Sequence, residues 1–598
     1  MANEHSFIEG KLVPFALGIL SVGWLLSQLL FSFIMPIHPM VLLPIFLCFA
    51  FSIVCLSHPF PGSRKFPLLR LLDFAVIPLC VWVSLTYYGD AERILTRIPY
   101  ISEILPEDIT AFYIIMILLM ETMRRVLGWN LLVFVAIFIV YSFTGDKLPG
   151  LLHFPGFSVE SFAEIMTLSG EGVFGSALGP TASYIFYFIV FGAFFSVCGG
   201  GQLLIDIGMK VSDPKSGGPA KAAVVSSGLM GMVSGSAVAN VTTTGVLTIP
   251  LMKKVGYKPH EAGSIEAVAS TGGQIMPPIM GAAAFLMAEY MDLPYMQVAV
   301  KAILPAVLYF AGIFITVHLE AKKLGLKGIP KNELPKVSYL LKKVYLLLPL
   351  VLLIALVSSG ARTMQFSASV SILAAIVVGF LNSEERLTPG KILEALEAGA
   401  RGAVTVAVAC AMAGIIAGCI TVTGLASILI NGIVNLAGNA TIIGLVLTML
   451  CCIVLGMGVP TTANYCIMAA TCAPILVRMG VPTVAAHFFV FYFGIVADLT
   501  PPVALAAYAG AAIAQSNPMK TAFTATKLAI GAFIVPYVFA LNPAMLFIET
   551  TAWEVILICI TSFVGIFAVS AALEGYILRP MAWYQRIICA AGGLLLIY

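Results

Sequence analysis

Short polar side chains gather at the centre of a long uncharged stretch, where their oxygen atoms could bind a cation. The stretch lies between Lys221 and Lys253, and its 31 residues include the polar segment SGSAVANVTTT. Hydroxyl and amide oxygens are suited to Na⁺, and unwound backbone adds carbonyl oxygens. The side chains that could supply such oxygens are those of Ser234, Ser236, Asn240 and Thr242. We therefore predict an ion site within this segment.

The same pattern occurs a second time, at a constant offset of 224 residues. The informative matches are Asn240 with Asn464, Pro250 with Pro474, Gly256 with Gly480, and Pro277-Pro278 with Pro501-Pro502. Matching alanines mean little in so apolar a chain, but these residue types at one offset indicate an internal repeat. The second copy offers the oxygens of Thr461, Thr462 and Asn464.

Each of these stretches has the wrong length for ordinary membrane crossings. A single span needs roughly 20 apolar residues, so 31 uncharged residues are too many for one span and too few for two spans with a turn. We predict a re-entrant helical hairpin that enters the membrane and returns to the same side. Non-helical backbone at that depth is tolerated only where it is buried in protein or lines a cavity.

A second polar interruption follows each hairpin. It reads STGGQIMPP in the first copy, from Ser270 to Pro278, and GIVADLTPP in the second, from Gly494 to Pro502. Proline resists continuing a helix but suits the first turn of a new one. We predict that each interruption ends one half-helix and starts another at the prolines. Freed carbonyls of the first half could hold a cation, and the N-terminal dipole of the second could face an anion.

These arguments define two sets of candidate residues and no catalytic ones. The predicted ion-binding residues are Ser234, Ser236, Asn240, Thr271, Gly272, Gly458, Thr461, Asn464, Asp498 and Thr500. The predicted substrate-binding residues are Thr242, Gly273, Gln274, Pro277, Thr462 and Pro501. An integral-membrane enzyme would need a polar catalytic cluster at one membrane face. Hydroxyls, amides, Gly and Pro bind rather than react, so we predict that the protein is not an enzyme.

Several of these residues also have a simpler structural explanation. Asn240 and Asn464 could cap the second arm of each hairpin, because Asn is a favoured N-cap. Asp498 lies in a segment that must cross the bilayer, where an acidic residue is a functional candidate. It could equally cap a helix that begins at Thr500 or Pro501.

Two further acidic residues are interpreted as structural. Glu266 lies two turns from Lys258 and could reach the membrane interface. Glu121 stands three and four residues before Arg124 and Arg125, a spacing typical of ion pairs on a helix surface.

The composition is that of a polytopic membrane protein. Of the 598 residues, 60% are hydrophobic and only 10% are charged. The net charge of +3 comes without a basic run, so no nucleic-acid partner is expected. The 12 cysteines are scattered and form no CxxC pair, so we predict no metal or cofactor beyond the coupling cation. The N-terminal sequence lacks the features of a cleaved signal peptide, and the first apolar stretch is expected to remain as a membrane helix.

Apolar segments predict an all-α protein with about 15 transmembrane helices and two re-entrant hairpins. Spans are expected near 13–35, 40–57, 70–89, 109–127, 129–144, 175–199, 296–318, 340–358, 366–382, 401–421, 519–542, 553–574 and 580–597, with interrupted segments at 258–290 and 483–514. The runs 200–212 and 424–437 are expected to lie flat at the interface. The second hairpin is expected over 439–478.

The distribution of Lys and Arg predicts the orientation. Basic groups cluster between spans and at the mouth of the first hairpin, and counting spans places every group on one side, which must be cytoplasmic. They include Arg64, Lys65, Arg70, Arg124, Arg125, Lys210, Lys215, Lys221, Lys253, Lys254, Lys258, Lys322, Lys323, Lys327 and Lys331. The N-terminus is then cytoplasmic and the C-terminus periplasmic.

Five spans separate the matching points of the two copies. Because five is an odd number, the repeats are predicted to be inverted, over about 175–318 and 399–542. Inverted repeats with broken helices are typical of secondary transporters.

The hairpin motifs resemble those of one transporter family. FGAFFSVCGGGQLLIDIG, GMVSGSAVANVTTTG, IPLMKKVGY and GGQIMPP look like the large membrane subunit of TRAP transporters, the tripartite ATP-independent periplasmic transporters. GMGVPTTANY and ADLTPPVALAAY look like its second half. The resemblance covers roughly 129–545. Residues 1–127 are similar to the four-span small membrane subunit, so the chain resembles the fused permease, usually of the TAXI type, with two extra helices in 546–598.

The resemblance implies a function in the inner membrane of a bacterium or archaeon. It implies uptake of a small carboxylate that a separate periplasmic solute-binding protein delivers, driven by an ion gradient, Na⁺ or alternatively H⁺. It also implies an elevator motion, in which we expect 200–290 and 424–514 to slide against a frame that includes 296–318, 340–358 and 366–382. A divalent-anion symporter without a binding protein is the alternative, and the four-span extension argues against it.

Overall fold

The computed structural model describes residues 12–597, apart from 61–67, 212–216, 327, 329–333 and 439. Within these residues the chain is almost entirely helical and contains no β-strand. Ten of the described helices are long and apolar enough to cross a membrane. The chain is therefore an all-α polytopic membrane protein. Arg64, Lys65, Lys215, Lys327 and Lys331, which the orientation argument uses, lie outside the described residues.

The chain forms two compact units, which are described separately. The first unit comprises Met1–Cys198, Pro349–Leu429 and Thr462–Ala470. The second unit comprises Gly199–Leu348, Ile430–Thr461 and Thr471–Tyr598.

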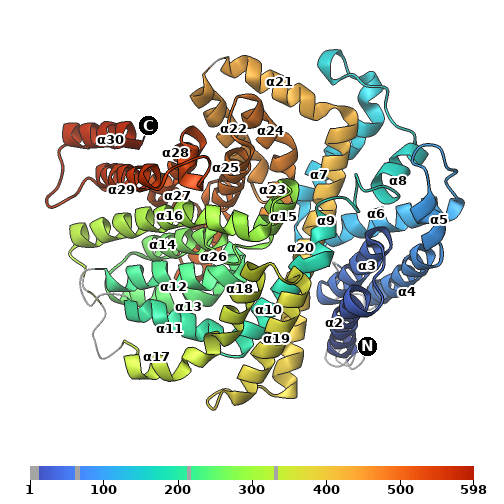
Figure 1. Ribbon diagram of the computed structural model, residues 1–598, viewed down its shortest axis with the longest axis horizontal. Coiled ribbons are helices and arrows are strands. Elements are labelled where there is room, and N and C mark those ends of the chain that lie inside the picture. Colours follow the sequence, from blue (N-terminus) through green and yellow to red (C-terminus); the bar gives the residue numbers. More distant parts are fainter. Residues whose placement is uncertain are drawn as a thin grey trace. The chain divides into compact units, whose positions relative to one another are not determined.

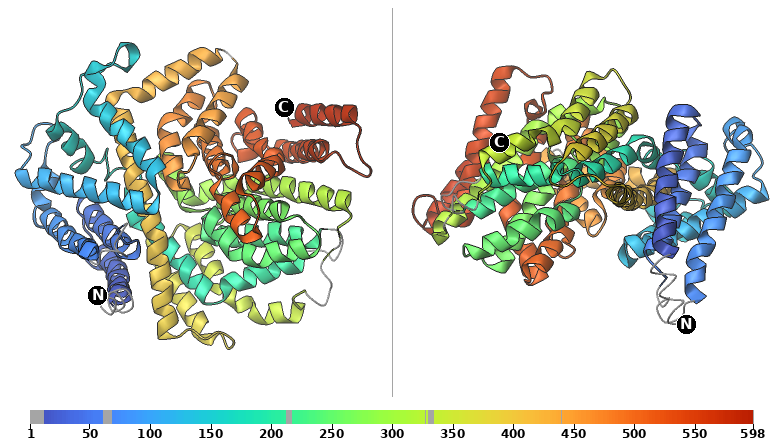
Figure 2. Two further views of the ribbon diagram at one scale, coloured as in Figure 1. Left: turned by 180° about the vertical axis from the view of Figure 1, so that it is seen from behind. Right: turned by 90° about the horizontal axis from the view of Figure 1, so that it is seen from below.

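The first unit begins with the four predicted helices of the N-terminal region. They are α2 (Val13–Leu29, extended by a π-helical turn to Ile34), α3 (Pro39–Ser57), α4 (Leu68–Gly89) and α6 (Pro106–Val126). α3 packs against α2, α4 and α6 (Figures 1 and 2). Its side chains are buried over almost its whole length, which explains the continuous apolar sequence of this helix.

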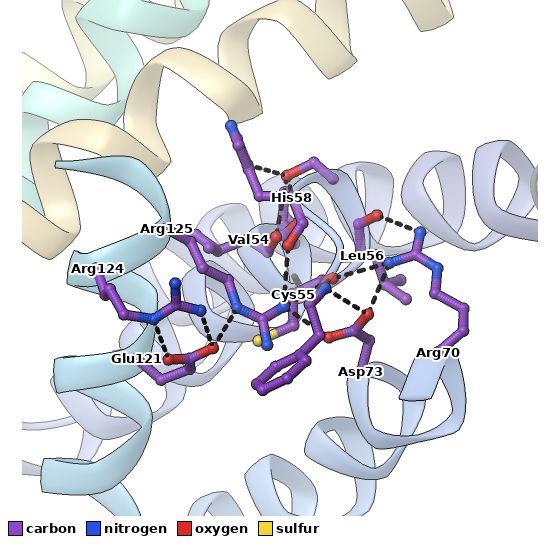
Figure 3. A network of polar contacts seen from close by, with 12 residues as sticks. Val54, Cys55, Leu56, His58, Arg70, Asp73, Glu121, Arg124 and Arg125 are labelled. Carbon is purple, nitrogen blue, oxygen red and sulfur yellow. Dashed lines mark hydrogen bonds and ion pairs between the residues drawn. The ribbon is translucent and has the colours of Figure 1, made fainter. Parts of the chain in front are cut away.

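A buried network of charges joins α3, α4 and α6 (Figure 3). Asp73 accepts hydrogen bonds from the guanidinium groups of Arg70, at 2.9 Å, and Arg125, at 2.6 Å. Arg70 also donates to the carbonyl oxygens of Cys55 and Leu56, at the end of α3. Asp73 is fully buried, so the network compensates charges that would otherwise be costly. The expected loop position of Arg70 was wrong, because Arg70 lies inside α4.

The pair formed by Glu121 with Arg124 and Arg125 belongs to the same network. Glu121 accepts from Arg124 at 2.8 Å and from Arg125 at 2.7 Å. The Arg125 side chain is only 6% exposed, and its second partner is buried Asp73. The interpretation as a surface pair was therefore wrong, because Arg125 links Glu121 to the interior of the unit.

The rest of the first unit is organised around a helix of 35 residues, α20 (Pro389–Thr423). It packs against α2, α3, α6, α7 (Trp129–Thr144) and α10 (Phe186–Val197). α8 (Val159–Thr167), α18 (Leu348–Ser359) and α19 (Met364–Leu381) belong largely or wholly to this unit. The predicted span 401–421 is thus the second half of a longer helix, which begins twelve residues earlier because Thr388 caps it.

The repeat is visible in the bounds of the helices. The first copy consists of α12 (Gly218–Ser234), α13 (Ala237–Lys254), α14 (Pro259–Gly272), the 3₁₀ turn η6 (Gly273–Ile275) and α15 (Ala282–Tyr290). The second consists of α22 (Thr441–Gly456), α23 (Thr461–Thr471), α24 (Ala473–Arg478), α25 (Thr483–Val496), η9 (Ala497–Leu499) and α26 (Leu505–Ala514). Matching elements begin within one residue of the 224-residue offset. Only the second arm differs, since α23 and α24 are separated at Cys472.

In the second unit α12, α13 and α14 lie side by side (Figure 1). α14 also packs against α16 (Tyr295–Leu324), α26 and α27 (Pro518–Phe533). The predicted amphipathic run 200–212 forms α11 (Gly200–Val211), which packs against α12, and 424–437 forms α21 (Leu425–Ala437). α17 (Val337–Lys343) precedes α18, and α28 (Val535–Leu541) follows α27.

Two C-terminal helices complete the second unit. α29 (Ala552–Glu574) and α30 (Trp583–Ile597) lie side by side (Figure 2). Glu574 at the end of α29 pairs with Lys527 of α27 at 3.0 Å, and its backbone oxygen accepts from Lys323 of α16. These contacts attach the C-terminal pair to the second unit. With 15 residues, α30 is shorter than the predicted span.

Candidate functional site

The first hairpin turns at two residues, Gly235 and Ser236, between α12 and α13. Gly235 adopts φ +62°, a left-handed conformation that ends α12 and that suits glycine. Ser236 then caps α13, because its hydroxyl accepts a hydrogen bond from the Ala239 N–H at 3.4 Å. The polar segment is therefore a helix–turn–helix tip, as the sequence predicts.

Glycines bring this tip directly against the broken helix that follows it. A Cβ added to Gly231 would lie 2.3 Å from the Cα of Gly273. A Cβ added to Gly235 would lie 2.8 Å from the Cα of Gly281. No side chain fits at either position without a backbone shift. The hairpin tip and the interruption after α14 thus form one site in the second unit.

Asn240 occupies the centre of this contact. Its Nδ2 donates hydrogen bonds to the backbone oxygen of Ser227, at 2.8 Å, and to that of Ser270, at 3.4 Å. Its Oδ1 is buried and has no hydrogen-bond partner among the described residues. The interpretation of Asn240 as a helix cap was wrong: Ser236 is the cap, and Asn240 lies one turn inside α13.

Two other buried polar atoms near this tip also lack partners among the described residues. They are the hydroxyl of Ser234 and the side-chain nitrogen of Gln274. Buried polar atoms are nearly always hydrogen-bonded, so these three atoms in neighbouring segments are candidates for contact with a ligand. Two other predicted ion-binding residues already have partners within the protein. The Thr271 hydroxyl donates to the backbone oxygen of Ala267, and Gly272 packs against Tyr309.

Thr242 faces outward from the same arm. It is exposed, and its hydroxyl donates to the backbone oxygen of Ala239 at 2.9 Å. It is therefore accessible to a ligand near the tip, whereas Asn240 lies behind it in the protein.

The prolines do not start the second half-helices, contrary to the prediction. Pro277-Pro278 and Pro501-Pro502 are both cis peptides in the connecting turns. The following helices begin four and three residues later, α15 at Ala282 and α26 at Leu505. Pro277 and Pro501 thus belong to the connections, so a helix N-terminus does not lie at either proline.

The second interruption contains a buried carboxyl. Asp498 lies in the 3₁₀ turn η9 and is 6% exposed, with the hydroxyl of Thr461 as a hydrogen-bonding partner. Of the two interpretations of Asp498, the one as a cap on a helix that begins at Thr500 or Pro501 was wrong, because α26 begins at Leu505. Thr500 instead donates to the backbone oxygen of Val496 at 3.0 Å.

The second tip also approaches its own interruption within the second unit. Gly458 adopts φ +73°, and a Cβ there would lie 3.0 Å from Val503 Cγ1. Thr462 and Asn464 follow on α23; both are buried, and that helix belongs to the first unit apart from its two ends.

Sequence reasoning underestimated one residue of this region. Glu266 of α14 is fully buried and cannot reach the interface, contrary to the prediction. Its carboxyl accepts hydrogen bonds from four hydroxyls, those of Ser227, Thr244, Thr248 and Ser270. The spacing gave a signal, because Thr244 and Thr248, like Glu266 and Ser270, stand four residues apart and share a helix face. Among the described residues, no group of His, Cys, Asp and Glu side chains could hold a metal ion through three such ligands.

Comparisons with known proteins agree with this architecture. Residues 114–553 match the family model described as "Tripartite ATP-independent periplasmic transporter, DctM component". A putative TRAP transporter large permease protein of Haemophilus influenzae is 27% identical over 361 residues, covering 59% of this chain and 81% of that protein.

Other relatives include proteins whose names state a substrate. The C4-dicarboxylate TRAP transporter large permease protein DctM of Pseudomonas aeruginosa is 27% identical over 212 residues, covering 35% of this chain and 49% of that protein. The isethionate TRAP transporter permease protein DctMQ of Oleidesulfovibrio alaskensis is 21% identical over 333 residues, covering 55% and 52%. Because the family model covers most of the chain, this protein belongs to the DctM component family of tripartite ATP-independent periplasmic transporters.

Proposed function

We propose that this chain is the permease of a secondary transporter that imports an organic anion, most simply a carboxylate, together with Na⁺. The observation that carries the proposal is the buried Oδ1 of Asn240, which has no hydrogen-bond partner among the described residues although it lies at the contact of hairpin tip and broken helix. A buried acceptor without a donor costs about 1–3 kcal/mol. A bound cation would remove that cost, and neutral oxygen ligands are those that Na⁺ uses in broken-helix transporters.

The predicted ligands at this tip are Ser234, Ser236 and Asn240, with carbonyl oxygens around Thr271 and Gly272. Gly458, Thr461, Asp498 and Thr500 of the second unit are proposed to form the second ion site. Asn464, on the part of α23 that belongs to the first unit, remains a predicted ion ligand. The two sites are not equivalent, since Asp498 carries an acidic group where the first copy has the neutral Gln274.

An anionic substrate is proposed to bind at the hairpin tips, through hydroxyls and backbone dipoles rather than through a fixed positive side chain. The relatives named for C4-dicarboxylate and isethionate carry organic anions. The chain has no Lys or Arg between Lys221 and Lys253, and none from Gly402 to Val477. Exposed Thr242 is the proposed first contact of the substrate in the first copy. The other proposed substrate-binding residues are Gly273, Gln274 and Pro277 of the same copy and Thr462 and Pro501 of the second copy.

The transport motion is proposed to be an elevator. Tyr309 of α16 donates a hydrogen bond to the backbone oxygen of Val268 at 2.8 Å, and a Cβ on Gly272 would lie 2.2 Å from the Tyr309 ring. This close packing favours a moving body that contains α16 as well as α12–α15. The proposal therefore departs from the expectation that 296–318 belongs to the frame.

Both membrane subunits of the transporter are proposed to be joined in this one chain. Residues 1–127 would act as the small membrane subunit, 128–545 as the large one, and 546–598 as an addition, in a fused permease of the TAXI type. The partner would be a periplasmic solute-binding protein, with the N-terminus in the cytoplasm of a bacterium or archaeon.

Reconstituted transport tests the function directly. The full chain would be placed in liposomes with an inward Na⁺ gradient, and uptake of labelled C4-dicarboxylates and monocarboxylates measured with and without purified binding proteins of the same organism. We expect uptake only when both a binding protein and Na⁺ are present. Uptake without any binding protein would favour the divalent-anion symporter, and uptake indifferent to Na⁺ would refute the Na⁺ coupling.

A further inference from the structure

The cage of hydroxyls around Glu266 is the strongest feature that the proposed transport site does not use. Ser227 Oγ lies 2.6 Å from Glu266 Oε1, and Ser270 Oγ lies 3.1 Å from the same oxygen. Thr244 donates to Oε1 and Thr248 to Oε2. The four hydroxyls come from both arms of the hairpin and from α14, so the carboxyl joins all three helices.

From this geometry we propose that Glu266 is a reversible proton-binding site, separate from the Na⁺ site at the hairpin tip. The carboxylate takes one proton from water when the hairpin opens to one side, and the neutral acid returns it on the other. The ligand is thus H⁺ itself, and no other reactant is needed.

Counting donors shows that the cage satisfies both forms of the carboxyl. Each hydroxyl has a single hydrogen. When Glu266 is ionised, all four hydroxyls can donate to it. When Oε2 is protonated, it donates to Thr248, whose own hydrogen turns to the backbone oxygen of Thr244, at 3.1 Å. The Thr244 hydrogen turns to the backbone oxygen of Asn240, at 2.8 Å, while Ser227 and Ser270 still donate to Oε1. The change requires only rotation of O–H bonds.

The cage is absent from the second copy, although that copy has the same helices. The five residues at the 224-residue offset are Cys451, Met468, Cys472, Val490 and Gly494. The hairpin fold is therefore built in the second copy without any of these polar groups. The hairpin fold therefore does not require the Glu266 cage. Because the cage also places a carboxyl in a fully buried position, we infer a role for it other than holding the hairpin together.

Other titratable groups do not neutralise Glu266. α14 itself carries His260 and Glu261. The elements packed against α14 carry four tyrosines, Tyr295, Tyr309, Tyr492 and Tyr508. Their charged and imidazole side chains are Lys221, Lys253, Lys254, Lys301, His318, Glu320, Lys322, Lys323, His487, Asp498, Lys520 and Lys527. Among the described residues none of these groups forms an ion pair or hydrogen bond with Glu266. Lys253 instead donates to the backbone oxygen of Ala514, and Lys527 pairs with Glu574.

Two residues, Ser227 and Ser270, connect the proton site with Asn240 near the hairpin tip. Ser227 and Ser270 donate to Glu266 through their hydroxyls, and their backbone oxygens accept from Asn240 Nδ2. A change at Glu266 is thereby transmitted to Asn240 through two adjacent groups. This gives a direct physical route by which H⁺ would influence the tip, and this part of the inference rests on the proposed transport function.

The test uses infrared spectra of the purified full chain, titrated over pH, and needs no transport. We expect a carboxylic acid C=O band that disappears on raising the pH, is lost in Glu266→Gln and persists in Glu261→Gln, a control on the same helix that pairs with Lys258. If Glu266→Gln does not fold, Thr248→Val should retain the band and shift its midpoint. A spectrum in which no titrating band depends on position 266 would overturn the proposal.

Transport measurements then test the coupling. With equal Na⁺ on both sides, a gradient of one pH unit can drive up to about tenfold accumulation for each coupled proton. We expect this accumulation in the wild type and its loss in Glu266→Gln, with Na⁺-driven uptake retained. Equal responses of wild type and Glu266→Gln would overturn the coupling. If the wild type carries no substrate at all, the transport function fails while the infrared result still decides whether Glu266 binds a proton.

Discussion

Gly231 and Gly273 touch backbone to backbone: a Cβ on Gly231 would lie 2.3 Å from the Gly273 Cα, and one on Gly273 would lie 2.5 Å from the Gly231 Cα. This contact joins the first arm of the hairpin to the turn after α14. A Cβ added to Gly231 would also lie only 3.0 Å from Asn240 Nδ2. The candidate ion site therefore depends on the absence of two side chains.

Gly231→Ala should separate the tip from the broken helix. Overpacking of this kind costs about 1–3 kcal/mol, and we expect Na⁺-dependent uptake to fall at least about tenfold, with a lower unfolding temperature. Gly432→Ala in α21 is the matched control, since a Cβ there would have no atom of the described residues within 4 Å. Normal uptake by Gly231→Ala would show that this contact is not needed for transport.

Asn240→Ala should weaken Na⁺ binding more than it weakens folding. It removes one proposed oxygen ligand, so the Na⁺ concentration for half-maximal uptake should rise roughly tenfold, which corresponds to about 1.4 kcal/mol. Thr243→Val is the control, because Thr243 is exposed on the same helix and its hydroxyl donates to the backbone oxygen of Ala239 at 2.9 Å. An unchanged Na⁺ dependence in Asn240→Ala would place the ion elsewhere.

Asp73→Asn should destabilise the first unit without touching the hairpins. It removes the carboxylate that accepts hydrogen bonds from Arg70 and Arg125, whose side chains are 3% and 6% exposed. Removing one partner of a buried ion pair costs about 3–5 kcal/mol, measurable as a lower unfolding midpoint in detergent.

The control for that measurement is an exposed pair in the same unit. Glu385 lies 4.0 Å from Lys391 and its side chain is 68% exposed, so Glu385→Gln should change stability by less than about 1 kcal/mol. Equal effects of the two substitutions would mean that burial of the Asp73 network adds nothing.

A cross-link between α12 and α16 tests which helices move together. A Cβ on Gly228 would lie 3.1 Å from the ring of Phe310, so cysteines at both positions can be joined by a short thiol reagent. Because we propose that α16 moves with the hairpin, uptake should stay within about twofold of the unlinked protein. Uptake that stops on cross-linking and returns on reduction would assign α16 to the frame.

The control for the reagent is a pair in the C-terminal helices. Cys589 Sγ lies 3.3 Å from the backbone oxygen of Ala568, so Ala568→Cys can be linked to it. Both experiments need a background in which the other cysteines are replaced. Linkage of this control pair should leave uptake unchanged.

The sequence alone determined the periodic and compositional features of this protein. Apolar length predicts the helices, and the 224-residue offset predicts the start of each repeated element to within one residue. It also indicates a turn within the polar segment SGSAVANVTTT and the two polar interruptions, because glycine, proline and uncharged polar residues act on the local backbone. These features depend on neighbouring residues and can be seen without knowing what packs against them.

Only the tertiary structure decided which polar groups meet. The sequence around Asn240 fits a helix cap as well as an ion ligand. The structure shows that Ser236, one turn earlier, is the cap of α13, so Asn240 is not. The sequence predicted that Glu266 reaches the membrane interface, because it lies two turns from Lys258. In the structure three of its four hydroxyl partners lie 18 to 39 positions away in the chain, and the fourth is on its own helix. Burial and hydrogen bonding between distant segments depend on how helices pack in three dimensions, which local spacing does not encode.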